Sequence, residues 1–189
     1  MARYIVPLVF GLAGIAILVS LGVWQMQRLT WKEGILADID ARIAADPVAL
    51  PAAPDPQADR YLPVQVDGQI GDQALRVLVS QKQVGAGYRV ISALDLGNRR
   101  ILLDRGFVKV SADIPAPPQG TVKITGNLHW PDDRNSSTPE NDVADNTWFA
   151  RDLEQMADVL GTEPLLVVAR DTSFSDAPVM PLPVDTSNI

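Results

Sequence analysis

The sequence predicts a mainly β protein with few helices, in which an N-terminal transmembrane helix precedes an antiparallel, barrel-like β-sheet domain. The first supporting observation is that residues 4–27 carry no charge and are mostly apolar. The second is that the chain beyond residue 60 consists of short segments rich in Val, Ile and Leu, separated by Gly or Pro. The third is that one segment of that region, residues 150–161, has a clear helical pattern.

The N-terminal segment reads "YIVPLVFGLAGIAILVSLGVWQMQ". About 20 apolar residues in a helix span the roughly 30 Å hydrocarbon core of a bilayer. A cleaved signal peptide is the competing interpretation, but its apolar region would have about 7–15 residues and end at a small-residue cleavage site. Here the run is longer and continues into "VWQMQRLTW". We therefore predict a retained anchor over residues 1–29, whose orientation the flanking charges leave open.

Residues 30–46 are predicted to form an amphipathic helix that either continues the anchor or starts anew. Thr30 and Glu33 match a capping box, the pattern of a helix start. The apolar side chains of this segment recur on one helical face: Ile35, Leu36, Ile39 and Ile43. Prolines then recur through residues 47–60, which predicts an extended connector.

The β domain is predicted over residues 61–177, followed by a tail over residues 178–189. The short "GN" connection at 97–98 favours an antiparallel hairpin between its neighbours. The late helix "ARDLEQMADVLG" should stop at Gly161. The candidate strands are residues 61–70, 74–80, 88–96, 100–110, 121–130 and 165–171.

The composition excludes several classes of function. The net charge is −7, which argues against a nucleic-acid partner. There is no cysteine, so disulfides, thiolate metal sites and thiol catalysis are excluded. The sequence contains one histidine, His129, and no G-x-S-x-G, phosphate-loop or EF-hand motif. We predict neither an enzyme nor a metal site, and we interpret the acidic stretch 132–146 as a solvated loop.

The strand "RILLDRGFV" at residues 100–108 contains a charged pair among apolar residues. Successive side chains of a strand point to opposite faces, so Asp104 and Arg105 cannot pair with each other in a regular strand. Gly106 favours a bulge, which would release both residues from strict alternation. Arg105 then needs a carboxylate, either inside the domain or on something bound to it.

Three stretches resemble the Surfeit locus family of cytochrome c oxidase assembly factors. They are "LGVWQMQRLTWKEGIL" (21–36), "GYRVISALDLGNRRILLDRGFV" (87–108) and "NDVADNTWFARDLEQMA" (141–157). The family has, in the same order, a Gly-x-Trp-Gln-x-x-Arg motif at the end of its first span, an Arg-Gly-aromatic-Val strand, and an Asn-Asp motif before an Asp-led helix. Together the stretches extend the resemblance over nearly the whole chain.

The resemblance implies an assembly factor rather than an enzyme, one that assists delivery of haem a to the catalytic oxidase subunit or its retention there. The implied partners are that subunit, other oxidase assembly factors and the lipid bilayer. The implied location is a bacterial cytoplasmic (inner) membrane with an extracytoplasmic β domain that faces the periplasm; the lack of a targeting presequence before Arg3 favours a bacterial origin. The alternative function is a membrane-anchored scaffold or accessory subunit of another complex, without haem.

The resemblance also assigns candidate residues. The membrane-end motif is Trp24, Gln25, Arg28 and Trp31. The candidates for contact with a partner or with haem are Tyr88, Asp104, Arg105, Gly106 and Phe107. The residues expected to cap and pin the late helix are Asn141, Trp148 and Asp152. The family has a second span with a proposed haem-ligand histidine, expected about where this chain ends in "PLPVDTSNI". His129 does not match that histidine, so we assign no haem ligand.

Overall fold

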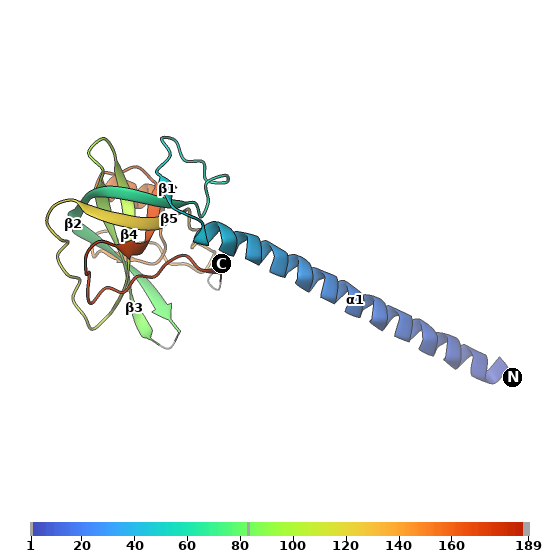
Figure 1. Cartoon of the computed structure of the whole chain (residues 1–189). Helices are drawn as coiled ribbons and strands as arrows, with labels where there is room; N and C mark the ends of the chain where they lie inside the picture. Colours follow the sequence, from blue (N-terminus) through green and yellow to red (C-terminus); the bar gives the residue numbers. More distant parts are fainter. Residues whose placement is uncertain (1, 83, 187–189) are drawn as a thin grey trace. The chain divides into compact units, whose positions relative to one another are not determined.

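The structure is a computed structural model that describes residues 2–82 and 84–186 (Figure 1). It divides into two compact units, Met1–Ala41 and Arg42–Ile189. The start of the predicted tail lies in the described part, whereas its last three residues, 187–189, fall outside it.

The N-terminal helix α1 is continuous from Ala2 to Ala44. Among the described residues it is the one helix long and apolar enough to cross a membrane, by length and composition. The capping-box prediction was wrong, because Thr30 lies inside the helix and its Oγ1 donates to the Met26 carbonyl oxygen at 3.1 Å. The amphipathic segment therefore continues the anchor as one helix.

The second unit is a ring of strands (Figure 1). The sheet order is β1-β2-β3-β4-β7-β5, and β5 pairs back onto β2. Its elements are β1 (Val48–Ala49), β2 (Pro63–Gln81), β3 (Gly85–Asp95), β4 (Arg100–Lys109), β5 (Val122–His129), β6 (Thr147–Trp148), α2 (Leu153–Leu160) and β7 (Leu166–Thr172).

The long strand β2 closes the ring because its two halves have different partners. Pro63–Gly68 pairs with β5, and the rest pairs with β3. Two separate strands, residues 61–70 and 74–80, were predicted here, but the gap between them is a register shift between Ile70 and Ala74 within one strand. The strand bends at this irregularity instead of ending.

The sheet is mixed rather than purely antiparallel. The chain passes through α2 between β5 and β7, and β7 then pairs antiparallel with β5 and parallel with β4. The predicted hairpin at 97–98 is confirmed, since β3 and β4 pair antiparallel on either side of it. The predicted stop of α2 is also confirmed: Gly161 has a left-handed backbone with φ of 64°.

Strand β4 is buried on both faces, which accounts for its apolar run over residues 101–103. Ile101 and Leu103 belong to one apolar cluster, together with Val64, Ile124 and Leu128. Leu102 points the other way, into a second cluster. That cluster contains Trp148 and, from α2, Met156 and Leu160. The charged residues that follow in β4 are therefore held between two packed layers.

Candidate functional site

The site begins at a bulge in β4. Val90 of β3 lies opposite Gly106, but its neighbour Ile91 lies opposite Asp104, so Arg105 is an extra residue without a counterpart. The predicted bulge is therefore present. Asp104 is 0% exposed and Arg105 is 3% exposed. Two adjacent charges are buried here, and each needs a partner to offset its loss of hydration.

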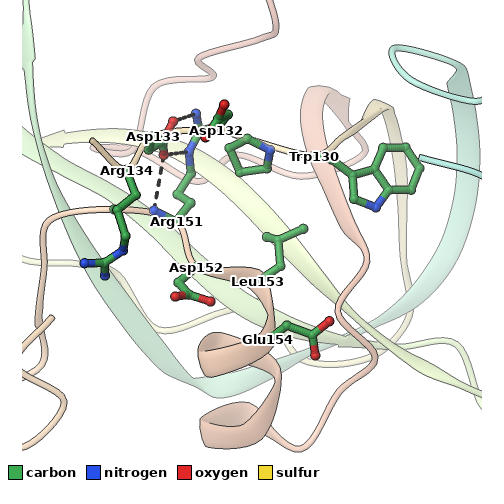
Figure 2. Close-up of a pocket in the computed structure, with 10 residues that line it drawn as sticks. Trp130, Asp132, Asp133, Arg134, Arg151, Asp152, Leu153 and Glu154 are labelled. Atoms are coloured by element: carbon green, nitrogen blue, oxygen red, sulfur yellow. Dashed lines mark hydrogen bonds and ion pairs between the residues drawn. The ribbon is translucent and has the colours of Figure 1, made fainter. Parts of the chain in front are cut away.

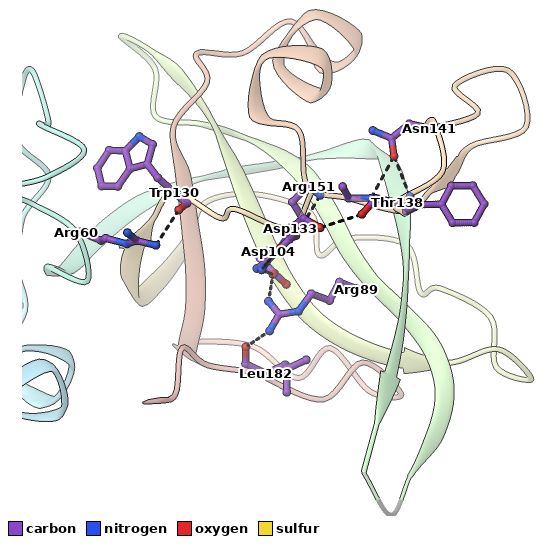
Figure 3. Close-up of polar contacts among 11 residues, drawn as sticks. Arg60, Arg89, Asp104, Trp130, Asp133, Thr138, Asn141, Arg151 and Leu182 are labelled. Carbon is purple, nitrogen blue, oxygen red and sulfur yellow. Dashed lines mark hydrogen bonds and ion pairs between the residues drawn. The ribbon is translucent and has the colours of Figure 1, made fainter. Parts of the chain in front are cut away.

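Asp104 is the centre of a network with two arginines (Figure 3). It forms an ion pair with Arg89 of β3, and its Oδ1 accepts a hydrogen bond from the Gly106 N–H at 3.0 Å. On the same carboxylate, Oδ2 lies 3.8 Å from Nη1 of Arg151, which precedes Asp152, the N-cap residue of α2. The network thus joins the bulge of β4 to the start of α2.

Arg105 points to a different carboxylate, Asp176, in the segment after β7. Its Nε donates to Asp176 Oδ2 at 2.8 Å, and its Nη2 also donates to the Pro115 carbonyl oxygen at 3.1 Å. The carboxylate that Arg105 requires is therefore inside the domain. Asp104 and Arg105 do not pair with each other; they lie at the bulge, where strict alternation does not apply, and each has its own partner.

The C-terminal strap, residues 173–186, crosses β4 at the bulge. The backbone N–H and C=O of Met180 pair with those of Phe107, both at 2.7 Å. Arg89 donates to the Leu182 carbonyl oxygen at 3.0 Å. Together with the Arg105–Asp176 pair, these contacts connect the strap to three residues of the stretch 87–108: Arg89, Arg105 and Phe107. A methyl group on Gly106, whose φ is +123°, would overlap the Met180 carbonyl, so only glycine permits this close approach.

Arg151 carries the network on to Asp133. Its Nε lies 2.6 Å from Asp133 Oδ2 and its Nη2 lies 2.9 Å from Oδ1, a bidentate pair. Burial raises the pKa of Asp133, but the hydrogen bonds and positive charge of Arg151 outweigh it and hold that pKa below 3.8. For Arg151, burial lowers the pKa, and the Asp133 carboxylate more than offsets this. Both groups remain charged at neutral pH.

A pocket of about 230 Å³ opens beside this pair, between residues 130–134 and the start of α2 (Figure 2). Its apolar part includes Trp130 and Leu153. Its exposed carboxylates are Asp132 and Glu154. A pocket with apolar walls and exposed carboxylates suits a basic side chain with an apolar stem, presented by another molecule.

His129 is packed next to this site rather than open to it. It is 8% exposed, and its ring stacks on Tyr61 with centroids 5.7 Å apart. Burial, followed by the positive charges of Arg151 and Arg60, lowers the pKa of His129 to about 3. The imidazole is therefore neutral at physiological pH, and its Nδ1 has no hydrogen-bond partner within the described chain.

Replacing His129 by phenylalanine should remove an acid-sensitive contribution to stability. The folded-state pKa is about 3 and the ordinary value is 6.5, so between these pH values only the unfolded chain binds the proton. Wild-type stability should therefore fall on acidification through this window, by up to roughly 5 kcal/mol. Urea unfolding at pH 7 and pH 4.5 measures this: H129F should lose less stability than wild type. Equal losses would contradict the buried neutral state.

The predicted residues of the stretch 141–157 fix the start of α2. The Asp152 side chain accepts from the Gln155 N–H as the N-cap. Asn141 Oδ1 accepts from the backbone N–H groups of Phe149 and Ala150 at 2.9 and 3.2 Å. Trp148 is fully buried. These contacts place Arg151, between Ala150 and Asp152, where it reaches Asp133 and Asp104 (Figure 3).

The remaining candidate residues lie apart from the network. Tyr88 is half-buried, with the Arg76 guanidinium 5.5 Å from its ring centre. In α1, the Arg28 guanidinium lies 5.6 Å from the ring centre of Trp24. Gln25 and Trp31 are exposed on the same helix. Phe107 is buried and reaches the site through its backbone bonds to Met180.

Four residues of the site were missed at the sequence level: Arg89, Asp133, Arg151 and Asp176. Asp133 shows the reason: the acidic composition of residues 132–146 is typical of a solvated loop, yet this side chain is partly buried against Arg151. The one available signal was position, since Arg89 and Arg151 lie inside two of the quoted motifs.

Known proteins of one family are similar to this chain over most of its length. A family model described as the SURF1 family matches residues 12–188. Surfeit locus protein 1 of Mus musculus is 31% identical over 188 residues, covering 86% of this chain and 60% of that protein. The Homo sapiens protein of the same name is 33% identical, with 79% and 58% covered. A SURF1-like protein of Monosiga brevicollis is 30% identical, with 79% and 65% covered. The chain thus spans about 60% of the length of these relatives.

Proposed function

The chain belongs to the SURF1 family, and on this basis we propose that it is an assembly factor for an aa₃-type cytochrome c oxidase. The observation that carries the proposal is the match of the family model to residues 12–188. The charge state of the site agrees with a role in binding: Asp133 is held ionised and His129 neutral, so neither changes protonation near neutral pH.

The proposed partners are the catalytic oxidase subunit, other oxidase assembly factors and the lipid bilayer. We propose that the pocket at the start of α2 is a point of protein contact. It combines the exposed carboxylates of Asp132 and Glu154 with the apolar side chains of Trp130 and Leu153. The buried network behind it keeps this surface rigid, which lowers the entropic cost of binding.

Haem a enters this proposal as transient cargo that is delivered to, or retained at, the catalytic subunit. The pocket does not fit haem a itself, because its 230 Å³ is below the roughly 300–1,000 Å³ of sites that enclose drug-sized ligands. A second hollow is lined by Asp67 and Asp95, whose carboxylates would repel haem propionates. We therefore propose that these two hollows of the β domain do not enclose haem a, and that the domain acts on the haem-receiving partner.

We propose further that α1 anchors the chain in a bacterial inner membrane with the β domain in the periplasm. The support is the apolar helix and the family membership. Protease added to intact spheroplasts should digest the β domain. Protection that is lost only on lysis would place the domain in the cytoplasm and contradict this orientation.

The proposed function is tested by deleting the gene in the source organism and measuring cytochrome c oxidase activity in membranes. The activity should fall and return on complementation, while succinate dehydrogenase activity stays unchanged. Unchanged oxidase activity in a strain without a second copy, with co-purification of the chain with another membrane complex, would favour the scaffold function.

The pocket itself is tested by the double charge reversal Asp132→Lys and Glu154→Lys. Both side chains are exposed, so the variant should fold, with a stability within about 1 kcal/mol of wild type. We expect oxidase activity in the complemented strain to fall several-fold, because the reversed charges would repel a basic partner group. The matched control reverses two acids outside the pocket, Asp67 and Asp171, and should complement fully. Full complementation by the pocket variant would exclude this contact.

A further inference from the structure

The hairpin formed by the end of β2 and the start of β3 differs in charge from the rest of this acidic protein. Residues 73–94 contain Arg76, Lys82 and Arg89 but no acidic residue, whereas the chain as a whole has a net charge of −7. Lys109 of β4 joins this group, because it lies opposite Gly87 of β3. We call residues 74–82 and 84–90 the hairpin arm; Figure 1 shows it extending from the ring.

Two of these four cations are available to a partner. Arg89 is committed to Asp104, and Arg76 donates to the Asp145 carbonyl oxygen at 3.1 Å with its guanidinium 5.5 Å from the ring centre of Tyr88. Lys82 and Lys109 form none of the ion pairs found within residues 2–82 and 84–186. Lys82 and Lys109 are exposed. The arm thus presents unneutralised positive charge on a domain that would otherwise repel acidic molecules.

The arm also has an open backbone edge. On one side, β2 pairs with β3 up to Gln81; on the other, β6 pairs with it at Arg76 and Val77 only. Across the described residues, no strand covers the outer edge of β2 at Leu78–Gln81. Edges of this kind are usually blocked by proline, inward-pointing charge or a covering segment, because they can pair with another chain.

The side chains along the open edge favour a protein ligand. Leu78 is 44% exposed, and Val79, Ser80 and Gln81 carry no charge that would block strand pairing. An added strand gains backbone hydrogen bonds along such an edge, and its side chains meet those of alternate positions. Lys82 at the end of the edge would then contact acidic side chains of that strand.

We propose that the hairpin arm binds an extended acidic segment of the catalytic oxidase subunit by strand addition at Leu78–Gln81. This inference rests on the proposed function for the identity of the partner. The open edge supplies backbone hydrogen bonds, and the acid-free cationic surface selects an acidic sequence.

The test uses the full chain in zwitterionic lipid nanodiscs and the purified catalytic subunit as the probe. Hydrogen exchange of the Leu78–Gln81 amides should slow when the subunit is added. Lys82→Glu should weaken binding about tenfold, because it places a repelling charge beside the acidic segment. The matched control is Lys123→Glu on β5, an exposed lysine outside the arm, which should leave the affinity unchanged.

The outcomes separate this inference from the proposed function. Binding that protects other segments but leaves Leu78–Gln81 unchanged would overturn the inference while the assembly function stands. Equal effects of Lys82→Glu and Lys123→Glu would also overturn it. Protection of the arm by anionic vesicles alone, without the subunit, would show that it contacts a bilayer instead. Absence of any binding to the subunit would count against both proposals.

Discussion

Replacing Asp104 by alanine should destabilise the β domain by about 3–5 kcal/mol. The carboxylate is fully buried, pairs with Arg89 and accepts the Gly106 N–H, so its removal leaves an uncompensated cation and an unpaired donor. It also removes the nearby charge that faces Arg151 at 3.8 Å. Urea unfolding of the full chain in mild detergent, followed by tryptophan fluorescence, measures the loss.

The matched control for this variant is Asp132→Ala. Asp132 is an exposed aspartate of the neighbouring pocket, and its truncation should change the free energy of unfolding by no more than about 0.5 kcal/mol. A D104A variant as stable as D132A would show that the network does not hold the bulge, the strap and α2 together.

Replacing Gly106 by alanine should have the second large effect, a loss of about 3 kcal/mol or more. The residue has φ of +123°, a conformation that side chains disfavour, and the added methyl would overlap the backbone of Met180. The strap must then leave β4, which breaks the Phe107–Met180 pairing. Limited proteolysis should therefore cut the strap sooner in G106A than in wild type, alongside the lower unfolding midpoint.

The variant Gly97→Ala separates the cost of a positive φ from the cost of the close contact with the strap. Gly97 also has a positive φ, +88°, but no atom lies within 4 Å of an added methyl group. This variant should lose only about 1–2 kcal/mol and keep the strap protected. If G97A and G106A behave alike, backbone strain alone explains the cost, and the close contact with the strap is not important.

Local patterns predicted much of the fold, while long-range pairing was beyond them. The apolar run of α1, the β3–β4 hairpin and the Gly161 stop each depend on neighbouring residues. The parallel pairing of β7 with β4 depends on where the chain returns after α2, which no local pattern specifies. The division of β2 between two partners is likewise set by closure of the ring. Thr30 shows the reverse case, since a capping pattern was overridden by the continuing helix.

The sequence predicted the charged residues of the site and the bulge, but it did not predict which residues pair with those charges. Alternation along a strand predicted that Asp104 and Arg105 need separate partners, and Gly106 predicted the bulge. The identity of those partners is non-local: Asp176 is 71 residues from Arg105 in sequence. Asp133 occurs in a stretch that looks solvated, because composition does not show that Arg151 returns to cover it. Sequence patterns therefore indicated which residues needed partners, and the topology supplied them.

The most direct test of the assembly function is the ratio of haem a to catalytic subunit in membranes with and without this gene. Reduced-minus-oxidised spectra give the haem a content, and immunoblotting gives the subunit level. We expect the subunit still to be made in the deletion strain but to carry much less haem a. The wild-type chain should restore the ratio, whereas D104A should not. A fully haem-loaded oxidase in the deletion strain, with no second copy of the gene, would contradict it.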